Sequence, residues 1–416
     1  MSAKEELYPV AVREIEAATG SGGLRITTVR RLGLLVVGLV AGKSSVVGQM
    51  ASGLWERGVS TVQVPSIARR LRRSLHDPKV TAETCYTPAL GTLVNWAGLS
   101  KRGKPVVLAL DESSQDERVH LLRVSLTYWG TALPLAWKIW PQNTPLEDGE
   151  YWAALDAVLA QVATIVPAGL EVIMTADRAF DIPPFIDRIA ARGWHWVVRL
   201  KANGATRLLD TQHREHAVKA LIQRHVAAPG QRWKARGRLF KKAGWRPASI
   251  IAVWAPGAQE PLVVVTDLPP RWEVLRTYDR RFWIETGFRT DKSSGWQWEA
   301  CQITDLAHLE RLLIAMAWAT CLILRLGLHE ARVRLHAIAR ARRATATHPA
   351  SRRPPKPQPA HESLFTLGLR LARRWLSRAA VPPASWTLTH LASPAWTSRW
   401  RQAQSHRFVF SQTVRS

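Results

Sequence analysis

A regular succession of strand-like and helix-like segments between Pro105 and Leu200 constrains the fold of this chain most strongly. Val106–Leu110 is a short apolar run typical of a buried central strand, and it ends directly at Asp111. Residues 122–139 then alternate apolar and polar side chains on both sides of Gly130, which predicts an antiparallel hairpin. A carboxylate at the end of a central strand is expected to face a cleft.

The same stretch continues with helices and strands in alternation. Residues 149–166 carry apolar side chains at helical spacing, and the strand-like run 172–174 ends shortly before Asp177. A second helix is predicted over 181–193 and a further strand over 196–200. Three strands followed by alternating helix and strand predict a mixed α/β sheet.

The charge balance points to a polyanionic partner. Lys and Arg number 58 against 32 Asp and Glu, which leaves a formal charge of +26. Basic genomic composition is the alternative, because Arg greatly outnumbers Lys, but it does not explain clustering. Three cysteines without a C-x-x-C pair exclude a disulfide framework and a zinc ribbon, and fit a reducing cytoplasm.

The first hundred residues read as helical. Residues 65–75 place Ile67, Leu71 and Leu75 on one face and arginines on the others, which suits a DNA-contacting helix or a solvated amphipathic helix equally. The apolar runs 32–41 and 312–324 are too short or too interrupted to span a bilayer, so we expect buried helices and no membrane partner.

A basic segment interrupts the second half of the α/β pattern. No acidic residue occurs from His216 through Gln259, and Lys234, Arg236 and Arg238 alternate with other residues near several tryptophans. This composition suits phosphate contact and base stacking, so we expect a DNA-facing, β-rich insertion. An exposed hairpin whose tryptophans cap the core is the alternative.

The predicted domain boundaries follow from these changes in composition and periodicity along the chain. Past Glu330 the chain has sixteen Lys or Arg and one acid, with a Pro-rich stretch over 348–359, which predicts a partly disordered basic tail. We predict a helical DNA-binding domain over 1–100, a catalytic core over 101–202 and 266–330, the basic insertion over 203–265, and the basic C-terminal region over 331–416.

The segment 278–292 is the most informative for chemistry. At about 100° per residue, Tyr278, Arg281, Glu285 and Lys292 fall on one face of a single helix. A surface salt bridge at the i, i+4 positions 281 and 285 is the simpler interpretation. That interpretation does not explain why Tyr278 and Lys292 lie on the same face.

These four residues reproduce a known spacing. The pattern Y-x2-R-x3-E-x6-K resembles the signature of the insertion-sequence-four family of bacterial transposases. The resemblance covers about residues 100–330. Asp111 and Asp177 stand where that family has its other two catalytic carboxylates, after the first and fourth strands. The resemblance implies a ribonuclease-H-like core, and the strand order inferred above agrees with it.

The resemblance also implies a DDE transposase that moves an insertion sequence by cutting and pasting DNA. Asp111, Asp177 and Glu285 would hold two Mg²⁺ or Mn²⁺ ions, because hard oxygen ligands suit these cations. Without metal the three carboxylates would repel one another and raise at least one pKa. Double-stranded DNA, at the element ends and at the target, would be the partner of a homodimer in a bacterial cytoplasm.

The implied DNA contacts include the two cations of the signature. Arg281 and Lys292 would hold phosphates, and Tyr278 would position the strand near its terminus. Trp283, Trp296 and Trp298 are candidates to stack on a flipped base, although a core position is the simpler expectation for each.

Three alternatives stay open or fail. Glu112 and Asp116 lie beside Asp111 and are alternative metal ligands. Residues 38–44 resemble a P-loop, but the glycine spacing is one short and no strand precedes them. A ribonuclease-H-like nuclease that cuts without transposing, or a DNA-binding protein with a dead active site, would share much of this pattern.

Overall fold

The structure of this protein is a computed structural model, and it describes residues 7–20, 24–96, 105–115, 118–201, 203, 205–347 and 363–378. The described strands form one ten-stranded sheet in the order β3-β2-β1-β4-β5-β10-β9-β8-β6-β7. The strands are β1 (Val106–Gln115), β2 (Val119–Tyr128), β3 (Thr131–Pro141), β4 (Val172–Ala176), β5 (His195–Arg199), β6 (Arg207–Leu209), β7 (Glu215–Ala217), β8 (Arg232–Leu239), β9 (Arg246–Val253) and β10 (Leu262–Thr266).

The first half of the sheet confirms the predicted α/β core. β1 pairs antiparallel with β2 and parallel with β4, and β4 pairs parallel with β5. The five residues Val106–Leu110 are all buried, as expected of a central strand covered on both faces. The order β3-β2-β1-β4-β5, with β2 antiparallel, is the ribonuclease-H-like arrangement.

Helices cover both faces of this half. α7 (Asp148–Ile165) packs on β2 and β3, α8 (Pro183–Ala190) packs on β5, and α11 (Phe282–Arg289) packs on β1, β2 and β3. Neighbouring residues of a strand point to opposite faces, and Asp111 contacts α11 while Glu112 contacts α7. α7 and α11 therefore lie on opposite faces of the sheet.

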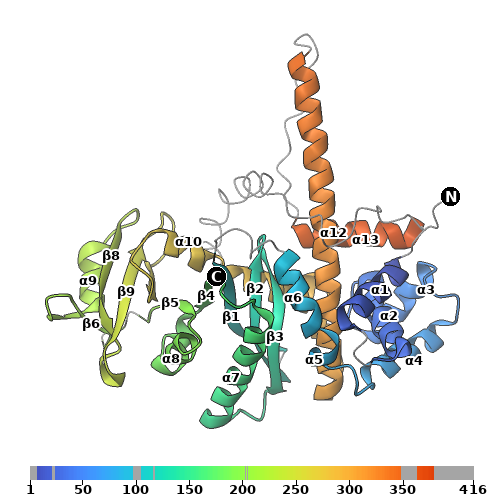
Figure 1. The fold of residues 1–416 in the computed structure, drawn as a ribbon, viewed down its shortest axis with the longest axis horizontal. Coiled ribbons are helices and arrows are strands. Elements are labelled where there is room, and N and C mark those ends of the chain that lie inside the picture. Colours follow the sequence, from blue (N-terminus) through green and yellow to red (C-terminus); the bar gives the residue numbers. More distant parts are fainter. Residues whose placement is uncertain are drawn as a thin grey trace.

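The predicted insertion is not a separate unit, because its strands extend the core sheet. β10 pairs antiparallel with β5, and β9 and β8 follow outward (Figure 1). The segment also contains the short helix α9 (Val218–His225). Its β-rich character is confirmed, and it joins the core sheet through the pairing of β10 with β5.

The N-terminal region is helical, as predicted. It contains α1 (Leu7–Thr19), α2 (Ile26–Gly42), α3 (Val47–Glu56), α4 (Val64–Leu75), α5 (Ala82–Cys85) and α6 (Thr87–Trp96). The apolar run 32–41 lies in α2 and is almost entirely buried. Most of the P-loop-like segment, residues 38–42, belongs to α2 itself, and just beyond it Ser45 N donates to the Trp296 carbonyl, which ties the end of α2 to a distant part of the fold.

α12 (Leu306–Thr347) is the long helix that connects these parts. It contacts both α2 and β3, and α13 (Leu364–Arg378) packs across it (Figure 1). The predicted boundary after residue 330 therefore falls inside a helix. Of the basic C-terminal region, residues 348–362 and 379–416 lie outside the described part of the chain.

Two apolar segments are long enough to cross a bilayer. The span Leu306–Arg334 of α12 passes by length and composition, and so does the bent pair α2 and α3 taken together. However, 89% of the most apolar window of Leu306–Arg334 is buried inside the protein. Burial of this kind is what a core helix shows.

Candidate active site

Asp111 and Asp177 each follow the last residue through which β1 and β4 pair. The predicted end of the first strand at Asp111 is wrong, because β1 continues to Gln115 through its pairing with β2. Leu110 on β1 and Ala176 on β4 are register partners, so the two aspartates are the next residues on neighbouring strands. The Asp111 carboxylate accepts a hydrogen bond from Glu112 N at 3.0 Å. Asp177 caps the 3₁₀ turn Arg178–Phe180 by accepting from Ala179 N at 2.8 Å. The prediction that both flank one cleft edge is consistent with this geometry.

Glu285 comes to the same edge on α11, but not on the single helix that the sequence predicts. α10 (Glu273–Asp279) ends before Arg280, and Arg281 N bonds to the Tyr278 carbonyl in an i to i−3 pattern. After Arg289 the backbone continues as a π-helical segment, Thr290–Ser294. Both departures from α geometry change the angle between successive side chains. The signature residues are therefore spread over α10, α11 and the π-helical segment and do not share one helix face.

Arg281 joins two of the three carboxylates. Its Nη2 donates to Asp111 Oδ2 at 3.1 Å, and its Nη1 donates to Glu285 Oε1. The Arg281 side chain is 9% exposed, against 14% for Asp111 and 42% for Glu285. A nearly buried guanidinium thus holds a nearly buried aspartate and a half-exposed glutamate together.

The expected repulsion among the carboxylates shows in the pKa of Asp111. Burial raises this pKa from its ordinary value to about 6, the Arg281 guanidinium opposes the rise, and the charges of Asp177 and Glu285 add to it. Asp177 and Glu285 therefore both lie within electrostatic reach of Asp111. Burial contributes more than repulsion, which the sequence alone did not indicate.

The donor chemistry of this edge suits a hard divalent cation. Three carboxylates provide only oxygen ligands, as Mg²⁺ and Mn²⁺ prefer. Across the described residues, no three His, Cys, Asp or Glu side chains already lie close enough together to hold an ion. Arg281 occupies the space between Asp111 and Glu285, so a shared site requires these side chains to rearrange.

The alternative ligand Glu112 points away from this edge. It accepts a hydrogen bond from the Tyr151 hydroxyl at 2.5 Å, on the face covered by α7. This contact and burial raise the pKa of Tyr151. Asp116 lies outside the described residues. Of the two alternatives, Glu112 is thus already engaged elsewhere.

The aromatic members of the predicted DNA site are mostly buried. Tyr278 is 1% exposed, and burial raises its pKa to about 12. Trp296 and Trp298 are both fully buried, so the predicted DNA contact by Trp298 does not fit this structure, and a core position does. Trp283 and Lys292 are partly exposed and accessible to a ligand.

β8 carries a row of exposed cations, which we call the β8 cation row. Its members share one face of the strand and are all exposed: Arg232, Lys234, Arg236 and Arg238. The intervening residues are partly buried on the other face, where Trp233 stacks on His225 of α9 at 5.4 Å. The cations are exposed while Trp233 packs inward, and DNA contact by this segment stays a prediction.

Arg232 and Trp272 were not singled out by sequence reasoning. The Trp272 ring lies 4.8 Å from the Arg232 guanidinium and 5.2 Å from the Lys234 ammonium. Strict alternation in the β8 sequence would have added Arg232 to the other cations. Trp272 precedes α10 and lies far from β8 in the sequence, so only the tertiary structure reveals it.

Other cations of this region are neutralised by carboxylates. Lys241 contacts Glu215 at 2.6 Å, and Arg246 contacts Asp187 at 2.7 Å. Within the described part of the chain, by contrast, no salt bridge is recorded for the β8 cation row. The positive charge of the row is therefore available to an external anion.

The β8 cation row lies on the same sheet face as the catalytic edge. Lys234, Ile251, Val264 and Arg199 are successive register partners across β8, β9, β10 and β5. Arg199 and Asp177 each lie two residues beyond the paired residues Val197 and Thr175, which puts them on this face as well. Five strand spacings of about 4.8 Å separate β1 from β8, or about 24 Å.

Part of the chain is similar to a known protein family. The family described as "Transposase DDE domain" matches residues 151–322, a segment that includes Asp177 and Glu285 but begins after Asp111. No curated protein matches the chain.

Two solved structures show distant likeness. A piggyBac transposase synaptic complex with hairpin DNA matches with 10% identity and a TM-score of 0.41, over 95% of this chain and 82% of that one. An Argonaute from Aquifex aeolicus matches with 9% identity and a TM-score of 0.23, over 44% of this chain and 25% of that one. The family match is the more specific finding: residues 151–322 are similar to a transposase DDE domain.

Proposed function

We propose that this chain is a DDE transposase that cuts DNA at the ends of an insertion sequence and joins those ends to a target. The observation that carries the proposal is that Asp177 and Glu285 both lie within electrostatic reach of Asp111, and that Arg281 links Asp111 to Glu285. The similarity of residues 151–322 to a transposase DDE domain supports it. The Y-x2-R-x3-E-x6-K spacing supports membership of the insertion-sequence-four family.

Asp111, Asp177 and Glu285 would hold two divalent cations, Mg²⁺ or Mn²⁺. When bound, such ions activate the attacking oxygen and stabilise the leaving oxygen of an in-line displacement at phosphorus. In the first step water adds to the scissile phosphorus and the bond to the 3′ oxygen breaks, which leaves a 3′-hydroxyl and a 5′-phosphate. In the second step that 3′-hydroxyl displaces the corresponding oxygen of a target phosphodiester.

The neighbouring cations would place the DNA strand. Lys292, on the π-helical segment beside α11, is accessible and would hold a phosphate near the scissile bond. The phosphate contact proposed for Arg281 requires its bonds to Asp111 and Glu285 to open, because both ends of the guanidinium are engaged. Lys234, Arg236 and Arg238 would bind the DNA backbone about 24 Å away.

Catalytic variants test this proposal directly. We expect Asp111→Asn, Asp177→Asn and Glu285→Gln each to abolish Mg²⁺- or Mn²⁺-dependent cleavage of a DNA fragment that carries the element end, while DNA binding persists. Glu112→Gln is the matched control, because Glu112 faces α7. Wild-type cleavage rates in any of the three variants would contradict the proposal.

A strand-transfer assay separates transposition from simple cleavage. Precut element ends with free 3′-hydroxyls, supplied with supercoiled target DNA, should become joined to it. A ribonuclease-H-like nuclease would hydrolyse DNA without joining it, and a catalytically dead DNA-binding protein would do neither. We also propose that the protein acts as a homodimer on DNA, and the size of the joined complex would test this. A DNA-associated cytoplasmic localisation is part of the same proposal.

A further inference from the structure

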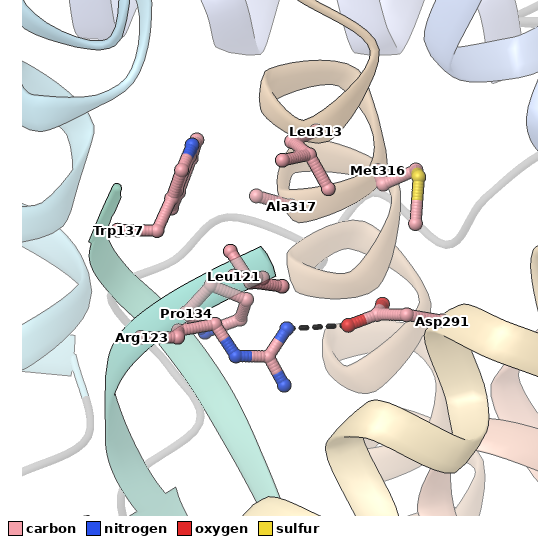
Figure 2. Close-up of a pocket in the computed structure, with 8 residues that line it drawn as sticks. All are labelled: Leu121, Arg123, Pro134, Trp137, Asp291, Leu313, Met316 and Ala317. Carbon is pink, nitrogen blue, oxygen red and sulfur yellow. Dashed lines mark hydrogen bonds and ion pairs between the residues drawn. The ribbon is translucent and has the colours of Figure 1, made fainter. Parts of the chain in front are cut away.

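Beneath the catalytic edge lies a buried ion pair that none of the steps above uses. Arg123 Nη1 on β2 donates to Asp291 Oδ2, and the two side chains are only 3% and 7% exposed. Figure 2 shows this pair in a small cavity, with Leu121, Pro134 and Trp137 on the sheet side and Leu313, Met316 and Ala317 of α12 opposite. The surroundings are almost entirely apolar.

The pair connects the strand beside Asp111 to the segment that carries Glu285 and Lys292. Arg123 is the register partner of Asp111, so both side chains point to the face that α11 covers. Asp291 lies in the π-helical segment directly before Lys292 and six residues after Glu285. One ion pair therefore links the two sides of the proposed active site.

Two further contacts press Arg123 against α11 itself. Its guanidinium lies 4.1 Å from the centre of the Phe288 ring. A Cβ added at Gly287 would lie 3.0 Å from Arg123 Nη2, so the absence of a side chain there permits the close approach. Arg123 thus contacts α11 on the turn that follows Glu285.

Stability alone does not explain such a pair. Within the described chain, Nε and Nη2 of Arg123 have no hydrogen-bond partner, so the guanidinium is buried with part of its bonding capacity unused. Replacing a buried ion pair by apolar side chains of similar volume is often neutral or stabilising. An ion pair holds its two partners in a preferred geometry, whereas apolar side chains do not.

We propose that Arg123 is a positioning residue, which sets the placement of Glu285 and Lys292 relative to Asp111 through its contacts with Asp291 and Phe288. This inference rests on the transposase function proposed above. Arg281 holds α11 to Asp111 at the start of the helix, and Arg123 holds its far end to β2. With both ends held, the backbone of α11 keeps one position over the sheet, from which the Glu285 side chain can turn toward Asp111.

The double variant Arg123→Met with Asp291→Leu tests this role. It removes both charges together, so it leaves no uncompensated charge in the core. The matched control is Arg325→Met with Glu14→Leu, because Arg325 and Glu14 form another ion pair at 2.9 Å, with Arg325 2% exposed, between α12 and α1. Thermal stability in EDTA, the Mg²⁺-induced shift of Tm, DNA binding and cleavage are measured for each protein.

We expect the Arg123/Asp291 double variant to fold and to bind DNA within twofold of wild type. The Mg²⁺ concentration for half-maximal cleavage should rise at least about tenfold, and the Mg²⁺-induced shift of Tm should shrink, as when a residue that orients metal ligands is lost. The control variant should keep the wild-type values of both.

Arg123→Lys provides a second test that retains the charge. Its shorter, non-planar head cannot contact both Asp291 and Phe288 in the same way, so we expect a smaller rise in the Mg²⁺ requirement with stability retained. A wild-type Mg²⁺ requirement in both Arg123 variants would overturn the positioning role. Absence of metal-dependent cleavage and of a Tm shift in the wild type would instead overturn the proposed function, and the inference with it.

Discussion

Arg281 changes the electrostatic description of the three candidate carboxylates. Three acids converging on one edge would be expected to repel each other, and neutralising one would then stabilise the metal-free protein. In the structure a nearly buried arginine is bonded to two of them, Asp111 and Glu285. Removing a carboxylate therefore relieves repulsion but also removes a partner of Arg281.

The role of Arg281 can be measured by stability. We expect Arg281→Ala to lower the free energy of unfolding by about 2 to 4 kcal/mol, because it leaves Asp111 charged and buried without its partner. Lys292→Ala, which removes a partly exposed cation of the same signature, should change stability by about 0.5 kcal/mol or less. Urea titrations in EDTA provide the measurement. Equal losses in the two variants would show that Arg281 is not the internal counter-ion.

Asp181, four residues after Asp177, provides a pH-dependent test. Its Oδ2 accepts from Lys201 N at 2.8 Å, and burial raises its pKa to about 7. A raised carboxyl pKa means that the folded state resists ionisation. The resulting loss of stability is absent below about pH 4, grows as the pH rises towards 7, and is complete above it.

We expect Asp181→Asn to match wild type near pH 4 and to exceed its free energy of unfolding by up to about 4 kcal/mol at pH 8, since each pKa unit corresponds to about 1.4 kcal/mol. Asp187→Asn is the control of opposite sign, because Arg246 lowers the pKa of Asp187. That variant should be slightly less stable than wild type at pH 7, and the difference should vanish as the pH falls through the lowered pKa. A pH-independent difference for Asp181→Asn would contradict the assignment.

At the scale of single elements, β8 places its basic side chains on one exposed face. A strand places every second side chain on one face, about 6.8 Å apart, which is close to the distance between neighbouring phosphates along one nucleic-acid strand. The β8 cation row occupies four such positions. Because carboxylates neutralise several nearby cations but not this row, the row is where DNA affinity should concentrate.

Salt dependence tests the β8 cation row. We expect Lys234→Gln with Arg236→Gln to reduce the slope of log affinity against log salt by about 1 to 2, since each phosphate contact contributes about 0.9. Lys219→Gln with Arg224→Gln is the charge-matched control, because both residues are exposed on α9, which packs behind β8. Equal slope changes in the two double variants would mean that net charge, and not the row, decides binding.

At the scale of the whole molecule, one sheet and one helix unite the chain. The sheet continues from β3 through the catalytic edge to β7, and α12 contacts both the sheet and the N-terminal helices (Figure 1). α13 buries Leu364, Phe365 and Leu369 against this arrangement. The C-terminal region therefore contains a structural helix as well as basic residues.

Two truncations separate these roles. Removal of residues 379–416 deletes four arginines and no acid, so the salt slope of DNA binding should fall by up to about 4. Removal from Ser363 onward also deletes α13. Because the apolar face of α13 is buried against the rest of the protein, this truncation should clearly lower Tm. A shorter truncation that lowers Tm but leaves the slope unchanged would refute a DNA role for the tail.

The sequence by itself determined the features that arise from local periodicity. A fully apolar run predicted the buried first half of β1, although the strand continues past Asp111 to Gln115, and helical and strand-like spacing predicted the alternation that leads to Asp177. Alternating cations on β8 predicted an exposed basic face. These succeed because neighbouring residues decide them, through the angle between successive side chains along a helix or strand.

Only the tertiary structure decided which distant groups meet. Arg281 reaches Asp111 across 170 positions and Arg123 reaches Asp291 across 168, and no local pattern encodes either contact. The break before α11 and the burial of Trp298 likewise depend on what packs around them. Packing against distant elements can override local preference, because the free energy of burial is set by the whole core and not by the segment that enters it.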